Sequence, residues 1–469
     1  MMKIDRTDKN TGRRRLSKKA VLWIVCISAA VLLAVAAAVL AFFFCEDGER
    51  EHSAAEENPE GAALVLENQK EGDFTYSVYD DNTVTLTGYT GDDTVVEIPE
   101  SLGGYPVTTI GLGCFNQEDL PMEEIRLPDT VTHFEAHSFG NAKNLKSITI
   151  PAGTTVIETG TFVYCSALEQ VHIPDSVTQI GEGAFYYCKS LAKIQLPPSL
   201  EKIGDYAFSM CTALSSITVP QGATSIGAYA FEGCSALAEV SLPDSVETIG
   251  EYAFNLCEAL TEFAVPSGVT AISEAVFNNC LALEQVTFPD GLETIGDMAF
   301  YYCEALRSVD FPDTLESIGE YAFLHCISLS QVVLPDSVDT LGAYAFADCT
   351  GLERVTLSKN LTEIPDYGFS QCEKLESIEL HDGITQIGVF AFVSCDEISE
   401  IVVPAGVTLL DAYAFSDMQG LLSVTIPDSV EEIGEGLLAY TDQVTVSCKE
   451  GSVIDEYCTA NEIAVSHVE

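Results

Sequence analysis

The chain has 469 residues, of which 47% are hydrophobic and 9% aromatic. This content is sufficient for a continuous core and excludes disorder as the dominant state. Residues 1–19 hold eight of the 21 Lys and Arg and two of the 72 Asp and Glu, so the remainder has 13 basic against 70 acidic residues, a net charge of about −57 (13 − 70). Such a negative field disfavours nucleic-acid binding and attachment to acidic membrane surfaces.

A run of 25 residues without charge, 20–44, is long enough to span a membrane as a helix. Five basic residues within 13–19 precede it, so the positive-inside rule places the N-terminus in the cytoplasm and the rest outside. A cleaved signal peptide is the alternative, with a cleavage site near 39–41, but its apolar region is usually only about 7 to 15 residues. The sequence therefore predicts a cytoplasmic basic tail at 1–19, a transmembrane anchor at 20–44 and an acidic, flexible stalk at 45–71.

A 23-residue repeat fills most of the remaining chain. Proline keeps this interval, with Ser358 and His381 in the two slots that it misses, at Pro128, Pro151, Pro174, Pro197, Pro220, Pro243, Pro266, Pro289, Pro312, Pro335, Pro404 and Pro427. Phenylalanine keeps it thirteen times, at Phe139, Phe162, Phe185, Phe208, Phe231, Phe254, Phe277, Phe300, Phe323, Phe346, Phe369, Phe392 and Phe415. This regularity indicates a solenoid in which each unit packs only on its neighbours.

The unit around Pro197 shows how one repeat should fold. Residues 191–196, LAKIQL, alternate between apolar and polar side chains in the manner of a half-buried strand. Pro197 ends this strand because proline has no N–H for the ladder. A second short strand around 200–203, a tight corner at Gly204 and a helical turn around 206–211 would close the coil.

The repeat LxxVxLPxxVxxIGxxAFxxCxxL resembles that of the BspA-like leucine-rich-repeat surface proteins, from Gly72 to the C-terminus. The resemblance implies a parallel-β leucine-rich-repeat solenoid with short turns or helical turns between strands, on a bacterial or protist surface, often associated with adhesion. It implies no particular ligand. We expect an N-terminal β cap and irregular first repeat at 72–127, the solenoid at 128–446 and a C-terminal cap at 447–469, all preceded by the one transmembrane helix.

Both ends of the solenoid have the features of caps, which keep a terminal rung from being an open sheet edge. Residues 74–98 alternate as strands, with Asp81 and Asn82 at the turn of a hairpin. Residues 452–461 are expected to form a short helix, followed by a strand at 463–468.

Cysteine forms a column three residues after the phenylalanines, at Cys165, Cys188, Cys211, Cys234, Cys257, Cys280, Cys303, Cys326, Cys349, Cys372 and Cys395. Stacked rungs place neighbouring positions about 5 Å apart, but parallel Cβ vectors are unsuited to disulfides. We expect a ladder of buried free thiols, since metal binding would require thiols that converge on a point. Cys448 and Cys458 lie ten residues apart in the C-terminal cap, where a disulfide between them is an alternative.

Acidic residues form two columns, for which we expect solvated turn caps, with weak calcium binding as the alternative. One follows the strand-ending residue, at Asp175, Asp244, Asp290, Asp313, Asp336, Asp382 and Asp428. The other follows the corner, at Glu182, Asp205, Glu251, Glu274, Asp297, Glu320 and Glu435.

Tyrosine forms a further column two residues before the phenylalanines, where a stacked ladder is expected. Tyr187, Tyr301 and Tyr302 follow the phenylalanines instead and are candidates for presenting rings to a glycan or a protein. The polar positions of the strands vary from rung to rung, which favours a binding surface. The candidate binding residues are Glu239, Glu262, Tyr187, Tyr301, Tyr302, Asp310 and Arg354.

Motifs of catalysis are missing from the sequence: it has no HExxH pair, no GxSxG elbow and no Walker glycine loop. We therefore expect no enzyme activity, no cofactor and no metal site. The favoured function is a cell-surface binding or adhesion protein with a macromolecular partner, a host or envelope protein or a glycan. The alternative is a structural spacer or cell-envelope organiser without a specific ligand.

Overall fold

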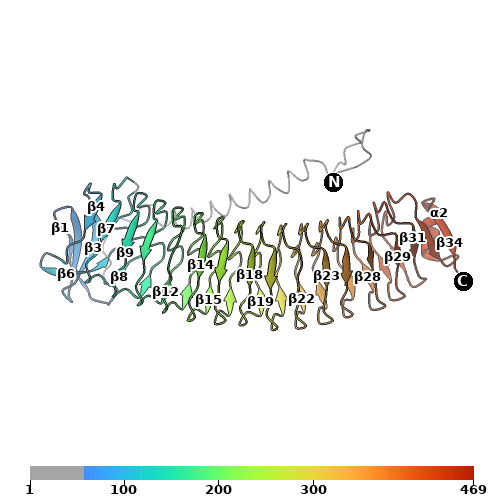
Figure 1. Cartoon of the computed structure of the whole chain (residues 1–469), viewed down its shortest axis with the longest axis horizontal. Coiled ribbons are helices and arrows are strands. Elements are labelled where there is room, and N and C mark those ends of the chain that lie inside the picture. Colours follow the sequence, from blue (N-terminus) through green and yellow to red (C-terminus); the bar gives the residue numbers. More distant parts are fainter. Residues whose placement is uncertain (1–56, 118, 469) are drawn as a thin grey trace. The chain divides into compact units, whose positions relative to one another are not determined.

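The computed structural model describes residues 57–117 and 119–468. Within them, parallel strands of successive repeats stack side by side into a solenoid (Figure 1). The register steps by 23 residues from rung to rung: Gln170 pairs with Ser147, and Lys202 pairs with Gln179. This fixed register confirms the predicted parallel-β leucine-rich-repeat solenoid.

The predicted tail at 1–19 and anchor at 20–44 lie outside the described residues. In the part of the chain that the structure describes, no helix is both long and apolar enough to cross a membrane.

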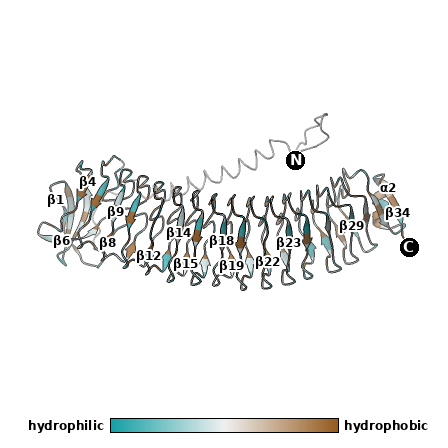
Figure 2. Ribbon diagram, viewed as in Figure 1, coloured by the Kyte–Doolittle hydropathy of each residue, from teal (hydrophilic) through white to brown (hydrophobic). Residues whose placement is uncertain are grey.

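The first series of strands lies just before the proline column and is mostly three residues long. Its members are β4 (Val95–Glu97), β7 (Glu124–Arg126), β9 (Ser147–Thr149), β11 (Gln170–His172), β14 (Ser216–Thr218), β16 (Glu239–Ser241), β18 (Glu262–Ala264), β20 (Gln285–Thr287), β23 (Gln331–Val333), β25 (Arg354–Thr356), β27 (Ser377–Ile378), β29 (Glu400–Val402), β31 (Ser423–Thr425), β33 (Thr445–Cys448) and β34 (Ala464–His467). In these strands the middle side chain is mostly buried and its two neighbours point to solvent. Figure 2 shows the resulting mixture of hydrophobic and hydrophilic residues within single strands.

The second series follows the proline and is two residues long. Its members are β8 (His133–Phe134), β10 (Val156–Ile157), β12 (Gln179–Ile180), β13 (Lys202–Ile203), β15 (Ser225–Ile226), β17 (Thr248–Ile249), β19 (Ala271–Ile272), β21 (Thr294–Ile295), β22 (Ser317–Ile318), β24 (Thr340–Leu341), β26 (Glu363–Ile364), β28 (Gln386–Ile387), β30 (Leu409–Leu410) and β32 (Glu432–Ile433). The chain then turns a corner where it passes close to the preceding rung. A Cβ on Gly204 would lie 2.9 Å from the backbone nitrogen of Glu182, which explains the glycine of the repeat.

The third side of each coil is a ladder of turns and not the helical turn expected at 206–211. Alternate N–H groups bind within the turn and across to the next rung: Ser209 donates to the carbonyl of Tyr206 at 3.0 Å, whereas Phe208 donates to that of Ala230 at 2.8 Å. Tyr206 consequently adopts a positive φ of 56°. Because half of the donors serve the neighbouring rung, no run of helical hydrogen bonds can form.

The phenylalanine column is a stack of rings in the core. Phe208 and Phe231 lie 5.4 Å apart at 5°, and Phe300 and Phe323 lie 5.0 Å apart at 8°. The rings from Phe139 to Phe415 are completely buried. The stack extends one rung before Phe139, to Phe115, whose ring lies 5.3 Å from that of Phe139. Phe115 is 24 residues before Phe139 and not 23, so the repeat period did not reveal it.

The cysteine column lies beside this stack, and the described cysteines are all buried free thiols, including Cys448 and Cys458. Each thiol of the ladder donates to the backbone carbonyl of a phenylalanine 26 residues earlier; Cys257, for example, donates to Phe231 at 3.3 Å. Burial raises the pKa of the Cys257 thiol far above its usual range, which keeps it protonated as a donor. The Phe231 carbonyl also accepts the backbone N–H of Cys234 at 3.1 Å, so the thiol supplies this carbonyl with a second donor, from the next rung.

Caps close both ends. At the N-terminal end β1 (Leu64–Glu71), β2 (Phe74–Tyr79) and β3 (Val84–Tyr89) form the predicted antiparallel hairpin with one additional strand, and β5 (Ser101–Leu102) and β6 (Tyr105–Ile110) form a second hairpin. At the C-terminal end α2 (Val453–Ala460), with Ser452 as N-cap, precedes β34, as predicted.

The stalk prediction for 45–71 was wrong over Leu64–Glu71. These residues form β1, because their backbone pairs with β2 from Leu64 to Glu71 despite two register shifts. Their acidic composition had suggested a flexible segment, but backbone pairing at a sheet edge tolerates polar side chains.

Candidate binding face

The outward side chains of the first strand series form one continuous surface, here called the strand face. It comprises the first and third position of each rung, and from Ser147 to Thr425 these side chains are exposed or half-buried. Alternation along a strand sends these side chains to solvent, so the strand face presents two parallel columns of side chains, one step apart per rung.

No side chain on the strand face from Ser147 to Thr425 forms a hydrogen bond or an ion pair with another described residue. The coil uses its polar groups differently on the side of the second strand series. There Ser176 donates to the carbonyl of Thr154 at 2.6 Å and Ser199 to that of Val177 at 2.6 Å, on the preceding rung. Polar side chains on that side hold rungs together, whereas those of the strand face have no such partner.

Acidic side chains at the turns also connect rungs. The carboxylates of Asp205, Asp297 and Asp366 accept the backbone N–H of the residue 23 positions later at 2.7 to 2.8 Å. They are caps, as expected, but each caps the next rung and not its own turn. Among the described residues no three His, Cys, Asp or Glu side chains are placed to hold a metal ion.

Four of the seven predicted binding residues lie on the strand face and are exposed: Glu239, Glu262, Asp310 and Arg354. Glu239 and Glu262 occupy the same position of neighbouring rungs, in β16 and β18. Asp310 and Arg354 lie further along the same face.

The other three predicted residues, Tyr187, Tyr301 and Tyr302, lie on the turn side and not on the strand face. The rings of Tyr301 and Tyr302 are 4.6 Å apart, and Tyr302 stacks on the His325 ring at 4.2 Å. Lys189 lies 3.9 Å above the Tyr187 ring. The structure therefore does not bring the predicted residues together, and these rings already pack against neighbours.

The tyrosine column forms the expected ladder, interrupted at Ala275 and Met298. Tyr206, Tyr229 and Tyr252 stack at 4.8 Å, and a second stack continues from Tyr321 to Tyr413 with Phe390 as a member. Parallel stacking covers the faces of the inner rings, so the ladder offers a partner mainly ring edges.

A charged cluster that the sequence analysis missed surrounds His325. Its Nδ1 lies 2.6 Å from a carboxylate oxygen of Asp348, and its Nε2 lies 3.7 Å from Glu304. Burial alone lowers the pKa of His325, but the Asp348 hydrogen bond and the two negative charges outweigh burial and raise it. The 23-residue spacing of His325 and Asp348 was the available signal.

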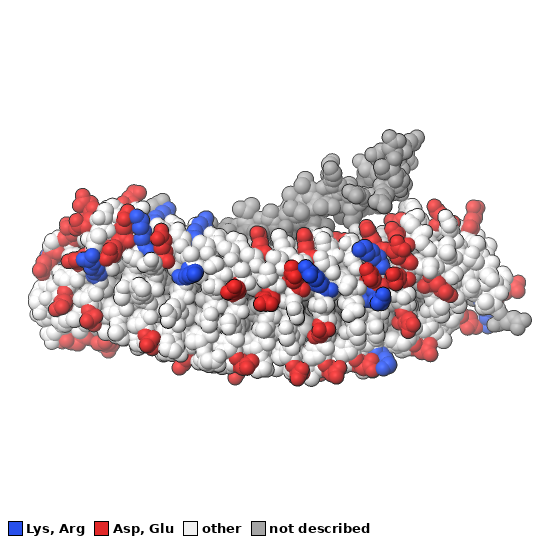
Figure 3. Space-filling model, in the orientation of Figure 1, with Lys and Arg blue, Asp and Glu red and all other residues white. Residues whose placement is uncertain are grey.

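Charge divides the strand face into two parts. The first, here called the neutral half, carries no carboxylate and consists of Ser147, Thr149, Gln170, His172, Lys193, Gln195, Ser216 and Thr218. The second, the acidic half, runs from Glu239 to Glu400 and includes Glu262, Asp310 and Glu379 against one base, Arg354. Figure 3 shows acidic side chains along both long edges of the visible face and at several places between them, and few basic ones.

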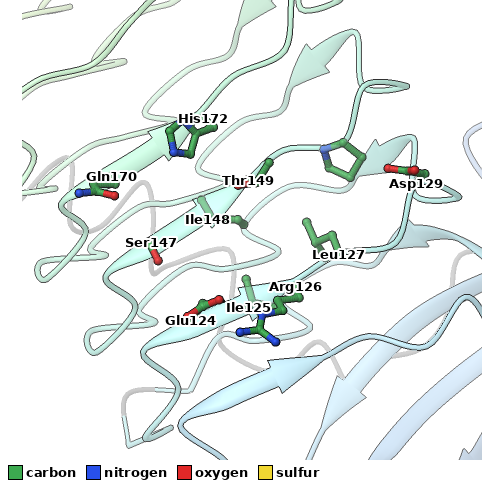
Figure 4. Close-up of a pocket in the computed structure, with 11 residues that line it drawn as sticks. Glu124, Ile125, Arg126, Leu127, Asp129, Ser147, Ile148, Thr149, Gln170 and His172 are labelled. Atoms are coloured by element: carbon green, nitrogen blue, oxygen red, sulfur yellow. Dashed lines mark hydrogen bonds and ion pairs between the residues drawn. The ribbon is translucent and has the colours of Figure 1, made fainter.

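A polar hollow of about 360 Å³ spans β7, β9 and β11, so it lies partly on the neutral half and partly on the preceding rung, where Glu124, Arg126 and Asp129 line it. Figure 4 shows its side chains in two rows across the three strands, one row of Glu124, Ser147 and Gln170 and one of Arg126, Thr149 and His172. A smaller hollow of about 130 Å³ adjoins it at His172 and reaches Asp175 and Gln195. Arg126 is paired with Glu97 and Glu124, at 2.6 and 2.9 Å, so it adds no free charge.

Comparison with known proteins gives a consistent result. A family model described as "BspA type Leucine rich repeat region (6 copies)" matches residues 108–238, 224–353 and 316–445. A leucine-rich repeat protein from Bacteroides ovatus is similar in structure, with a TM-score of 0.70 and 26% identity over 86% of this chain and 100% of its own. A leucine rich cell surface protein from Faecalibacterium prausnitzii has a TM-score of 0.50 and 30% identity over 79% of this chain and 95% of its own. No curated protein shows significant similarity.

Proposed function

Because the chain belongs to the BspA-type leucine-rich repeat family, we propose that it is a cell-surface protein whose strand face binds a macromolecular partner. The observation that carries this proposal is that the polar side chains of the strand face are not used within the fold, although hydroxyls and carboxylates elsewhere connect rungs. Polar side chains that form no hydrogen bond within the fold remain able to bind a partner. Binding, and not catalysis, is the proposed activity.

The acidic half is the proposed site for a protein partner that has a basic patch. Its carboxylates at Glu239, Glu262, Asp310, Glu379 and Glu400 are exposed and unpaired among the described residues. Their field would accelerate association with a basic surface and make it sensitive to salt. At about 5 Å per rung this half is roughly 35 Å long, which suits an extended partner and not a small molecule.

We further propose that residues 20–44 anchor the chain in the cell membrane, with the N-terminus cytoplasmic and the repeats outside. The basic flank and the length of the uncharged run support this orientation. The similarity to a protein named as a cell surface protein agrees with it. Protease treatment of intact cells should release the repeat domain, whereas a mature N-terminus near residue 42 would contradict the anchor.

A structural spacer without a specific ligand is the second candidate. The observation in its favour is the unbroken phenylalanine stack from Phe115 to Phe415, which would hold two points apart whatever the surface presents. A spacer, however, needs no particular side chains on the strand face, and this difference allows a test.

The test reverses charge on two faces by equal amounts. Full-length protein would be used to capture basic partners from host and envelope extracts, and the strongest partner would be titrated against two double variants. Glu239→Lys with Glu262→Lys changes the strand face, and Glu293→Lys with Glu316→Lys changes neighbouring rungs beside β21 and β22. We expect the first to weaken binding at least tenfold and the second to change it less than twofold. Equal effects of both would mean non-specific attraction and favour the spacer.

A further inference from the structure

The neutral half differs from the rest of this acidic protein in charge, shape and available hydrogen-bonding groups. Its eight outward positions include no carboxylate, although the chain has 72 acidic residues, and both hollows lie on or beside it. The acidic half, proposed above for a basic protein, lacks this composition. The two halves therefore favour ligands of different chemistry.

The hydrogen-bonding groups of the hollow fit a ligand with many hydroxyl groups. Gln170, His172 and the hydroxyls of Ser147 and Thr149 can both donate and accept, as can Gln195 in the adjoining smaller hollow. None of these side chains is hydrogen-bonded to another described residue. A hydroxyl group also donates and accepts. A ligand with many hydroxyls can therefore pair with all of these side chains, whereas a ligand that has only acceptors or only donors cannot use both functions of each.

The same surface lacks the anchors of a protein interface. Protein–protein interfaces are usually anchored by Tyr, Trp or Phe and by large apolar side chains. The eight positions of the neutral half include none of these residues. The floor does contain the half-buried aliphatic side chains of Leu127 and Ile173. These offer a modest apolar surface to the C–H groups of a sugar ring.

The charge of the protein also indicates whether the ligand is charged or neutral. The net charge of −51 repels anionic polymers such as uronic-acid glycans. Lys193 is the one permanently charged residue among the eight positions. Glu124, Asp129 and Asp175 line the hollows as acceptors, and Arg126, which also lines the larger one, is paired with Glu97 and Glu124. An uncharged ligand avoids the cost of repulsion and can use both kinds of group.

We propose that the polar hollow over β7, β9 and β11, with the smaller hollow that adjoins it at His172, is a subsite for a neutral oligosaccharide, held by Gln170, His172, Ser147 and Thr149 in the first and Gln195 in the second. The proposal rests on the proposed function, because it assigns a carbohydrate to one half of the same strand face. It predicts that sugar binding and protein binding depend on different residues.

The experiment uses full-length protein and a panel of neutral hexasaccharides with glucose, xylose, mannose and N-acetylglucosamine units, screened on an array and titrated calorimetrically. The test variant is Gln170→Ala with His172→Ala in β11. The matched control is Gln285→Ala with Thr287→Ala in β20, which changes the same two outward positions of a strand with the same burial pattern. We expect the test variant to weaken binding about tenfold or more, as two lost hydrogen bonds would, and the control to leave it within twofold.

Each outcome decides the matter. Saturable binding of a panel member that is lost in the test variant only would support the subsite. Failure of the whole panel, or equal losses in both variants, would overturn it. So would loss of the captured protein partner, but of no sugar, in the β11 variant. The charge-reversal result at Glu239 and Glu262 is independent, so the subsite can fail while the proposed function stands.

Discussion

The carboxylate of Glu232 lies 3.1 Å from the side-chain amide of Asn255 on the next rung, and both residues are only 4% exposed. Ser209, on the preceding rung, lies 3.4 Å from the other carboxylate oxygen. Burial raises the pKa of Glu232 to about 7, although hydrogen bonds from Asn255 and Ser209 oppose the shift. This carboxyl group therefore gains or loses its proton near neutral pH.

Replacement of Glu232 by Gln should stabilise the protein at alkaline pH. Because the pKa is higher in the folded chain than the usual 4.5, the stability is greatest below pH 4.5 and is lost as the pH rises to about 7. Above that pH the ionised carboxylate costs about 3 kcal/mol. Gln carries no charge, and its NH2 group can donate to the Asn255 oxygen, which has no partner. Urea unfolding at pH 5 and pH 8 would measure the difference.

Glu239→Gln is the matched control, because Glu239 is exposed on the neighbouring rung. Its effect on the free energy of unfolding should stay within about 0.5 kcal/mol at both pH values. If Glu232→Gln showed the same dependence on pH as the unmodified protein, the buried carboxyl would not be responsible.

The thiol of Cys257 offers a second prediction, because it is the hydrogen-bond donor to the Phe231 carbonyl. At the end of the ladder Thr441 takes this role, donating to the Phe415 carbonyl at 3.1 Å. Cys257→Thr should therefore be tolerated. Cys257→Val has nearly the shape of the Thr variant but no donor, and should cost about 0.5 to 1.5 kcal/mol more, because the carbonyl then keeps only its bond from the Cys234 N–H. Denaturant titration of the two variants isolates the donor; equal stabilities would show that the thiol only fills space.

The His325 cluster predicts a dependence on pH of the same sign as that of Glu232, but from a base that is paired when charged. The pKa of His325 is raised in the folded chain, so the stability from its pairing with Asp348 is fully present below pH 6.5 and is lost as the pH rises through the folded pKa. Asp348→Asn should therefore lower the melting temperature more at pH 5.5 than at pH 9. Asp310→Asn, which removes an exposed and unpaired carboxylate, serves as control. A larger effect of Asp348→Asn at pH 9 would contradict the assignment.

The repeat made the solenoid predictable, since Phe139 to Phe415 and Pro128 to Pro427 fix both the rung length and the register. It could not reveal the buried carboxyl group of Glu232, because the residues at this position of the repeat range from fully buried Ser209 to half-buried Asn278. The packing of Tyr301 and Tyr302 against each other and against His325 was hidden from the sequence for a related reason. Spacing gives the column, but the direction of the side chain follows from the positive φ of the turn, 59° at Tyr302.

The polar hollow could also be predicted only in part from the sequence. Gln170, His172 and Gln195 were recognisable as outward strand residues, and the absence of acidic residues from the outward strand positions between Ser147 and Thr218 can be read from the sequence. The hollow itself depends on how the side chains of three rungs pack, which the period does not encode.

The last prediction concerns Phe254, whose ring is fully buried between those of Phe231 and Phe277 at 5.3 and 6.0 Å and also contacts Phe263 at 5.0 Å. Phe254→Ala should cost about 3 to 5 kcal/mol through lost burial and the cavity left behind. Because each rung contacts only its neighbours, the loss should loosen nearby rungs before distant ones. Amide hydrogen exchange should therefore accelerate around Ile249 and Ile272 while Ile387 stays protected. Uniform acceleration from Phe139 to Phe415 would instead mean that the array unfolds as a single cooperative unit.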